Sequence, residues 1–414
     1  MNTTHVLIIG SVWPEPNSTA AGSRMLQLID LFQLQGWEIT FASAALPSSY
    51  MYDLETLGIK KVNIELNNTS FDEFIIKLQP VIVLFDRFMV EEQFGWRVST
   101  HCNTALRILD TEDLHCLRAA RKQALKENKI FTVDDLLLTD VAKREIASIL
   151  RCDLSLIIST YEMMLLKETF KINESLLFYI PFLLDRLEED SIKKWKNFNN
   201  RKDFVSIGNF LHEPNLDAVH YLKQIIWPLI RKSLPDAKLY IYGAYPSQKV
   251  GEMHQPYENF YVMGRAKDAK EVIESSRVVL APLRFGAGIK GKLVEAMQCG
   301  TPSITSTIGA EGMHANLKWS GVIANQPAEI AAAALQLYSD QLVWEEAQRQ
   351  GIQIINNCYN KKNGEELIIT IKKKQQNLYK HRTNNFIGAM LMHHSMASTK
   401  YMARWIEAKN KVNP

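Results

Sequence analysis

One succession of segments occurs twice in this chain, and this repetition restricts the possible folds more than any other feature. The first copy has an apolar run at residues 6–9, a loop rich in Gly, Ser, Pro and Asn, a helical pattern ending near Gly36, and another apolar run at 37–43. The second copy starts with the apolar run 203–210 and reaches a further run at 237–244. A strand, a crossover helix and a second strand make a parallel pair. The sequence therefore predicts an α/β protein with two doubly wound, Rossmann-like parallel sheets.

The spacing of further apolar runs sets the expected domain boundaries. Charged residues and asparagine dominate the stretch between the two series of runs, as is typical of a linker. The prediction is an N-terminal domain over residues 1–184, a linker over 185–201, a C-terminal domain over 202–383, and a C-terminal helix over 384–414 that packs back towards the N-terminal domain. Two such domains face each other across a cleft, and a ligand is expected at the carboxyl ends of the strands.

Charge is distributed unevenly along the 414 residues. The formal net charge is +3, but the segment from Lys361 to the end holds 11 lysines and arginines against 3 glutamates. This surplus indicates either an anionic partner, such as a membrane surface or a nucleic acid, or a solvated basic helix face. The five cysteines form no C-x-x-C pair, and no apolar run reaches the roughly 18 residues of a membrane span. A cytoplasmic protein without a metal site is expected, with peripheral attachment to the inner membrane face left open.

The stretch 284–300 combines glycine and positive charge at the start of a predicted helix. Gly286 and Gly288 precede Lys290 and Lys292, and Glu295 follows about one turn into the helix. Glycine allows an anion to approach the backbone, and a helix N-terminus adds partial positive charge. These features together suit a nucleotide diphosphate, with the glutamate accepting hydrogen bonds from ribose. The alternative interpretation is a glycine-rich turn that carries two surface lysines.

The pattern G-x-G-x-K-x-K-x-x-E-A-M-x-x-G-x-P, which starts at Gly286, resembles the donor-site signature of the family 4 glycosyltransferases. These are retaining enzymes with the two-domain GT-B fold. Four further segments, residues 14–25, 179–185, 206–215 and 306–313, are similar to other parts of the family, so the resemblance covers most of the chain. It implies a hexosyltransferase-type enzyme that moves a sugar from a nucleoside-diphosphate sugar to an acceptor hydroxyl. The acceptor is a glycan, a lipid-linked sugar or another molecule, and no cofactor or metal ion is required.

The resemblance also implies roles for individual residues. Lys290 is expected to carry most of the charge of the leaving diphosphate. The expected donor-binding set is Gly286, Gly288, Lys290, Lys292, Glu295, Arg284, Gly22, Asn209 and His212. Two departures stand out: Ala287 occupies a position where many members have a glutamate, and the loop 209–215 lacks a lysine or arginine.

A second group of charged residues follows the buried run that ends near Asp110. Glu112 and Asp113 stand where the resembling family often has His-Asp close to the reacting sugar, and they are the expected catalytic residues beside Lys290. Charges at the end of a buried strand are costly unless they are paired or functional. The alternative is an ion-pair network with Arg118 and Arg121 that fixes the start of the next helix.

Two other functions remain open at the level of the sequence. One is a GT-B sugar-nucleotide epimerase, which needs no acceptor. The other is a non-catalytic protein that binds a nucleotide sugar, which Ala287 and the missing basic loop residue would suit.

Overall fold

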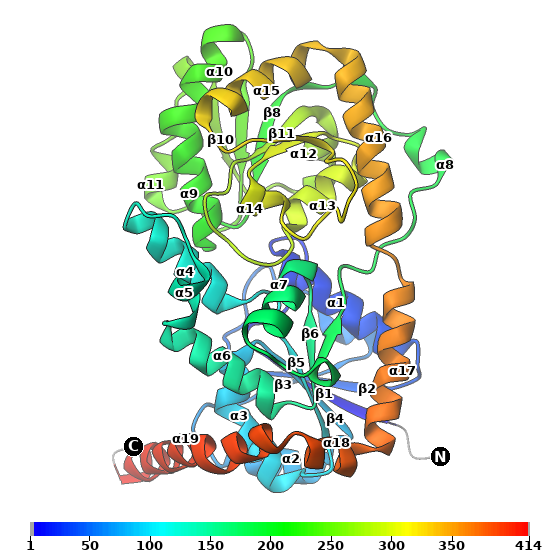
Figure 1. Cartoon of the computed structure of the whole chain (residues 1–414), viewed down its shortest axis with the longest axis vertical. Coiled ribbons are helices and arrows are strands. Elements are labelled where there is room, and N and C mark those ends of the chain that lie inside the picture. The colour runs from blue at the N-terminus through cyan, green and yellow to red at the C-terminus, as the bar shows by residue number, and fades with distance from the viewer. Residues whose placement is uncertain (1–3, 413–414) are drawn as a thin grey trace.

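The computed structural model describes residues 4–412, which form two α/β domains stacked along the long axis of the molecule (Figure 1). The N-terminal sheet has seven parallel strands in the order β3-β2-β1-β4-β5-β6-β7. Its strands are β1 His5–Gly10, β2 Glu38–Ser43, β3 Lys60–Asn63, β4 Ile82–Asp86, β5 Leu106–Asp110, β6 Leu154–Ile157 and β7 Leu177–Tyr179. Its helices are α1 Ala20–Gln33, α2 Ser70–Leu78, α3 Phe88–His101, α4 His115–Lys126, α5 Val133–Leu137, α6 Asp140–Arg151 and α7 Thr160–Met164.

The C-terminal sheet has six parallel strands in the order β10-β9-β8-β11-β12-β13. Its strands are β8 Lys202–Ile207, β9 Leu239–Tyr242, β10 Phe260–Gly264, β11 Ser276–Ala281, β12 Ser303–Thr305 and β13 Gly321–Ile323. Its helices are α9 Glu213–Tyr221, α10 Trp227–Ser233, α11 Gln248–Gly251, α12 Ala269–Ser275, α13 Gly291–Gln298, α14 Thr307–Ala310, α15 Pro327–Ser339 and α16 Gln341–Cys358. The linker carries the short helix α8 Glu189–Ile192. The prediction of two doubly wound parallel sheets is confirmed.

The central strands are apolar because both faces of each sheet are covered. Every residue of β4, β5 and β6 is buried. Strands covered on both faces read as continuous apolar runs rather than as alternating patterns, and this explains why these strands stand out in the sequence. In α1, the residues Met25, Leu28, Ile29 and Phe32 are buried on one face, as their helical spacing predicts.

The predicted end of the C-terminal domain at residue 383 is wrong. Helix α17 Lys362–Gln376 buries Leu367, Ile368 and Ile371 in the same apolar cluster as Leu28 and Phe32 of α1. The chain therefore crosses back to the N-terminal domain directly after α16, where Leu184 and Asn360 form a parallel bridge. Helical periodicity alone does not reveal which domain covers the apolar face of a helix.

The two last helices, α18 Leu378–Asn384 and α19 Phe386–Val412, also lie against the N-terminal domain (Figure 1). Helix α19 packs on α3 and α6 and buries Met396 and Ala403 beside Trp96. Arg97 pairs with Asp72 at 2.6 Å and with Glu407 of α19. Residues 413–414 of the predicted C-terminal segment lie outside the described residues. No helix within residues 4–412 combines the length and the apolar character that crossing a membrane requires.

Helix α17 offers a matched pair of isoleucines for testing its attachment. Ile371 is completely buried, whereas Ile369 on the same helix is 65% exposed. Ile371→Ala is expected to lower the free energy of unfolding by roughly 2–5 kcal/mol, because it removes buried methylene groups and leaves a cavity. Ile369→Ala is expected to change it by less than about 0.5 kcal/mol. Urea titration followed by circular dichroism measures both, and equal effects would contradict the packing of α17 described above.

Candidate functional site

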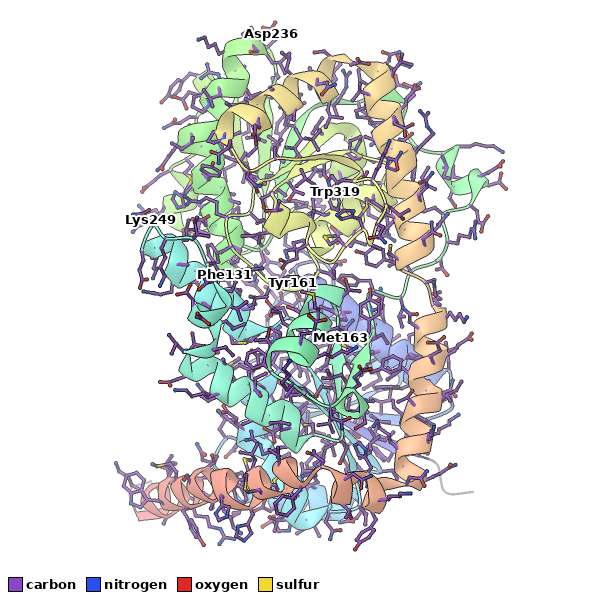
Figure 2. All side chains as sticks on the ribbon, viewed as in Figure 1. Phe131, Tyr161, Met163, Asp236, Lys249 and Trp319 are labelled. Carbon is purple, nitrogen blue, oxygen red and sulfur yellow. The ribbon has the colours of Figure 1, made fainter. Side chains whose placement is uncertain are left out.

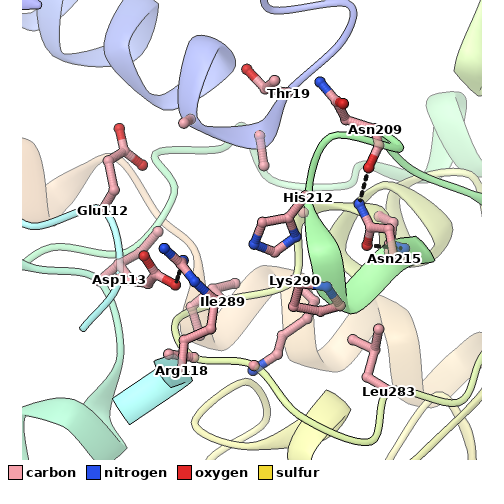
Figure 3. A pocket seen from close by; sticks show the side chains of 18 of the residues that line it. Thr19, Glu112, Asp113, Arg118, Asn209, His212, Asn215, Leu283, Ile289 and Lys290 are labelled. Carbon is pink, nitrogen blue, oxygen red and sulfur yellow. Dashed lines mark hydrogen bonds and ion pairs between the residues drawn. The ribbon is translucent and has the colours of Figure 1, made fainter. Parts of the chain in front are cut away.

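A cleft of about 440 Å³ lies between the two domains, and its walls come from both sheets (Figure 3). On the N-terminal side it is lined by residues 19–21, which follow β1, by Arg87 after β4, and by Glu112 and Asp113 after β5. On the C-terminal side it is lined by residues from the segment 209–215, which follows β8, and from the segment 283–292, which follows β11. The strand order reverses between β1 and β4 and again between β8 and β11. The cleft therefore joins the two positions where doubly wound sheets bind ligands.

The glycine turn between β11 and α13 touches the opposite domain. Gly288 has a positive φ of 64°, and a Cβ atom there would lie 2.7 Å from the Cβ of Asp113. Its amide N–H donates a hydrogen bond of 2.8 Å to Oε1 of Glu162 in α7. Only glycine meets both conditions without moving the loop, because it lacks a side chain and tolerates left-handed backbone.

Lys290 and Lys292 both reach the cleft. Lys290 is only 8% exposed, and its Nζ donates to the carbonyl oxygen of Gly288 at 2.8 Å. The Nζ of Lys292 donates to Oδ1 of Asn215 at 2.8 Å, and Nδ2 of Asn215 donates to the carbonyl oxygen of Asn209. Burial lowers the pKa of each lysine to about 8. The alternative interpretation of two surface lysines is therefore wrong.

Asp113 belongs to an ion-pair network on the N-terminal wall. It pairs with Arg118 (Figure 3), and its Oδ1 lies 3.3 Å from Nε2 of His115. Burial opposes its ionisation, but Arg118, His115 and His212 outweigh this effect and lower the pKa of Asp113 to about 2. Burial lowers the pKa of both His115 and His212 to about 4. At neutral pH the cleft thus contains an ionised aspartate beside two neutral imidazoles.

Glu112 has a strained backbone and an unsatisfied carboxyl group. Its φ is 60°, which is unusual for a residue with a side chain. Within the described part of the chain, its buried Oε1 has no hydrogen-bond partner. Burial, together with Asp110 and Asp86, raises the pKa of Glu112 well above its ordinary value. Strain and an orphaned polar atom at one residue that lines a cleft make Glu112 a candidate functional residue.

Three predicted donor-binding residues do not face the cleft. Nε of Arg284 donates to Oδ2 of Asp217 at 2.9 Å, and its guanidinium lies over the ring of Tyr221. Gly22 lies within α1, where a Cβ atom would come within 2.5 Å of the backbone of Glu15, so its small size serves packing.

Glu295 is the third. It lies on α13 outside the lining of the cleft, and burial raises its pKa against the opposing charges of Lys270 and Lys292. The other predicted residues, Gly286, Gly288, Lys290, Lys292, Asn209, His212, Glu112 and Asp113, surround the cleft or form its loops.

Two N-terminal side chains hold the glycine turn, and one of them was missed by sequence reasoning. Glu162 is completely buried, and its Oε1 accepts the amide N–H groups of Leu114 at 2.9 Å and Gly288 at 2.8 Å. Burial raises its pKa to about 8. The only signal in the sequence is an acid shortly after the apolar run 153–160.

The second side chain is Arg121, which sequence reasoning placed in a network within its own domain. It instead reaches the C-terminal domain, where it donates to the carbonyl oxygen of Gly286 at 2.9 Å and to both carboxylate oxygens of Glu311. Its guanidinium lies 5.3 Å from the ring centres of Phe131 and Tyr161, which lie near each other below the C-terminal domain (Figure 2). A bidentate, ring-stacked arginine fixes the spacing of the two domains at this edge of the cleft.

Residues 4–412 bring together no group of three or more His, Cys, Asp or Glu side chains that could hold a metal ion.

The family described as Glycosyl transferases group 1 matches residues 201–340, which span the C-terminal domain as far as the residue after α15. A search of curated proteins found no match. Among solved structures, sucrose-phosphate synthase from Thermosynechococcus elongatus superposes with a TM-score of 0.64 at 15% identity, covering 92% of this chain and 99% of that one. The chain has the GT-B glycosyltransferase fold.

Two further structures agree with this assignment of the fold. A glycosyltransferase from Rickettsia africae has a TM-score of 0.64 at 12% identity and covers 91% of this chain and 99% of its own. HepE from Anabaena, in complex with UDP and glucose, has a TM-score of 0.63 at 14% identity, with coverage of 89% and 99%. At such low identities these similarities establish the fold of the chain and not its substrates.

Glu162 allows a test of how the domains are joined. In Glu162→Gln the amide oxygen still accepts both N–H groups, so the free energy of unfolding at about pH 4, where the wild-type carboxyl group is mostly protonated in both states, should change by less than about 1 kcal/mol. Glu162→Ala leaves two buried N–H groups without an acceptor and should cost roughly 2–5 kcal/mol. Urea titration at about pH 4 separates the two outcomes.

A pH series provides the control. The folded pKa of Glu162 is raised to about 8, above the value of about 4.3 in an unfolded chain. The folded state therefore retains a proton that the unfolded state releases, and the contribution of this group to stability is lost as the pH rises from about 4.5 to 8. The Gln variant should lack this component, and an unchanged pH dependence would contradict the raised pKa.

Proposed function

We propose that this chain is a glycosyltransferase that moves a sugar from a nucleoside-diphosphate sugar to an acceptor hydroxyl. The observation that carries the proposal is the position of the buried Lys290 and the half-buried Lys292, which lie beside the glycine turn in a cleft between two ligand-binding switch points. The match of residues 201–340 to Glycosyl transferases group 1 supports the same activity.

A diphosphate is the anion that best compensates these two lysines. Both donate to uncharged acceptors, the carbonyl oxygen of Gly288 and Oδ1 of Asn215, although burial disfavours their charged forms. An ammonium group in a desolvated site gains most from a partner of opposite charge. Helix α13 begins at Gly291 and directs its positive end to the same place.

The finer features of the proposal rest on the resemblance in sequence and on one structural neighbour. The family 4 signature that starts at Gly286 favours retention of configuration at the sugar. HepE was solved with UDP and glucose, so UDP and a hexose are the first candidates for the donor of this chain. The loop after β8, with Asn209 and His212, is the proposed contact for the nucleoside half.

The proposed reaction breaks the bond between the anomeric carbon and the diphosphate oxygen. The diphosphate leaves with the electron pair, and Lys290, Lys292 and the start of α13 stabilise its charge. The acceptor oxygen then forms the new bond and releases its proton. The contribution of the protein is to stabilise charge and to hold both reactants in one cleft.

Glu112 is the proposed contact to the transferred sugar. Because its pKa is raised, its carboxyl group is protonated over a wider pH range and can donate a hydrogen bond to a sugar hydroxyl. Ala287, which stands in place of the glutamate of the resembling family, packs against the apolar core of the N-terminal domain. The carboxyl group of this site therefore comes from the opposite wall of the cleft.

Removal of the Lys290 charge should weaken nucleotide binding. Lys290→Met is expected to raise the Kd for UDP about 10- to 100-fold, because a charge-assisted hydrogen bond to a phosphate contributes about 1.5–3 kcal/mol. Isothermal titration calorimetry at pH 7 measures this effect. Lys249→Met, which changes an exposed lysine of α11, is the matched control and should leave the Kd unchanged.

The pH dependence of the same Kd tests the lysines independently. Binding requires protonated lysines, and their pKa of about 8 in the free protein means that affinity should fall as the pH rises from 7 to 9. The Lys290→Met variant should show a shallower decline, because one titrating group is gone. Equal affinities of the wild type and this variant at every pH would rule out the proposed diphosphate site.

A panel of sugar nucleotides tests the transfer itself. Purified protein is incubated with each donor, with and without an extract that supplies acceptors, and release of the nucleoside diphosphate is measured. A transferase should release diphosphate only when an acceptor is present. Release that does not depend on an acceptor would favour an epimerase, and binding without any turnover would favour a non-catalytic role.

Two variants of Glu112 test its proposed contact with the sugar. Glu112→Gln retains a hydrogen-bond donor and is expected to keep turnover within about tenfold, whereas Glu112→Ala should lower kcat by about 100-fold. Neither should change the Kd for UDP, since the carboxyl group does not contact the diphosphate. At saturating donor, wild-type kcat should fall as the pH rises and the carboxyl group ionises, and the Gln variant should lack this component.

A further inference from the structure

The outward face of α19 carries a row of exposed apolar side chains. This row, here called the outer stripe, consists of Phe386, Ile387, Met390, Tyr401 and Trp405, which are between 45% and 75% exposed. Their spacing places them on one side of the helix. The opposite side is the one that packs on α3 and α6. Helix α19 thus has two apolar faces, of which the N-terminal domain covers only one.

The charges of α19 have one sign at the surface. Arg404 and Lys409 are exposed next to the outer stripe, and Lys409 lies over the ring of Trp405 at 5.4 Å. The only acid between Leu378 and Asn410 is Glu407, which is turned inward to pair with the buried Arg97. Apolar and aromatic side chains bordered by basic ones are typical of a helix that lies in the plane of a membrane surface.

We propose that α19 attaches this protein to the surface of an anionic lipid bilayer. In this arrangement the outer stripe enters the boundary between headgroups and acyl chains, and Arg404 and Lys409 contact lipid phosphates. Figure 1 shows α19 at the end of the N-terminal domain that is remote from the C-terminal domain. The C-terminal domain therefore does not cover the outer stripe, and the interdomain cleft remains accessible when the helix is attached.

The composition of the stripe favours lipid over the two other candidate partners. A nucleic acid would require basic residues along the centre of the surface, but here they lie at its border, and the aliphatic chains of Ile387 and Met390 cannot stack on bases as aromatic rings do. A second copy of the chain would bring two sets of like charges together, because no exposed acid accompanies Arg404 and Lys409 on this helix. An anionic bilayer complements both the apolar and the basic parts of the surface.

Vesicle flotation with the full-length protein tests the proposal. The probes are vesicles of phosphatidylcholine alone and vesicles in which roughly one-third of the lipid is phosphatidylglycerol. The protein should float with the anionic vesicles and bind the neutral ones less tightly. The double variant Tyr401→Ser with Trp405→Ser should bind the anionic vesicles at least about tenfold more weakly, since it removes both aromatic anchors.

The charge variant and the matched controls complete the design. Arg404→Gln with Lys409→Gln should weaken binding on the order of 20-fold, because each basic residue near an anionic surface contributes about fivefold. Tyr257→Ser alters an equally exposed tyrosine of the C-terminal domain, and Arg186→Gln with Lys193→Gln alters two exposed linker charges. Both controls should bind as the wild type does. All the variants change exposed side chains, and a thermal melt verifies that each is folded.

Four results would overturn the proposal. The first two are failure of the wild type to bind anionic vesicles, and a loss of vesicle binding in the control variants equal to that in the stripe and charge variants. The third is a dimer in size-exclusion chromatography that the Tyr401→Ser, Trp405→Ser variant dissociates. The fourth is binding of a nucleic acid that the same variant abolishes.

Discussion

The geometry of the cleft depends on the close approach of Gly288 to the N-terminal domain. The missing side chain allows the turn to come within contact distance of Asp113, and its amide N–H reaches Glu162. Arg121 fixes the same turn from the other side through Gly286 and Glu311. If the turn moved away, Lys290 and Lys292 would leave the cleft with it, because the same short segment carries all of them.

The two walls of the cleft present different groups, and this difference matches the proposed reaction. The C-terminal wall supplies Lys290, Lys292 and the positive end of α13, which suits a leaving diphosphate. The N-terminal wall supplies the carboxyl groups of Asp113 and Glu112, which suit the hydroxyl groups of a sugar, and it also carries Arg87 and Arg118. Burial lowers the pKa of each lysine and raises the pKa of Glu112, and both changes favour the neutral form of the group. These groups are therefore held in a desolvated site, where a ligand of complementary charge gains more than it would in water.

The sequence predicts the fold well where strands are buried on both faces, and less well elsewhere. β4, β5 and β6 are fully buried and mostly apolar, but the edge strands β3 and β13 were missed, because the first is a half-exposed Lys-Lys-Val-Asn and the second is a half-buried run of three residues. The glycine and lysine turn was recognised in the sequence because its residues are adjacent along the chain. Glu162 was not, because its partner Gly288 is 126 positions away. The attachment of α17 was missed for the same reason.

The effect of the alanine at position 287, where the resembling family often has a glutamate, can be judged only from its surroundings in the structure. In the sequence, Ala287 is a missing acid and favours a weakened or absent activity. In the structure it is half-buried, lines the cleft and packs against the apolar core of the N-terminal domain. Across the cleft, Glu112 adopts a strained backbone and presents a carboxyl group whose Oε1 has no partner among the described residues. A carboxyl group is thus retained in the cleft on the opposite domain, so the loss of the acid at position 287 is no argument against catalysis.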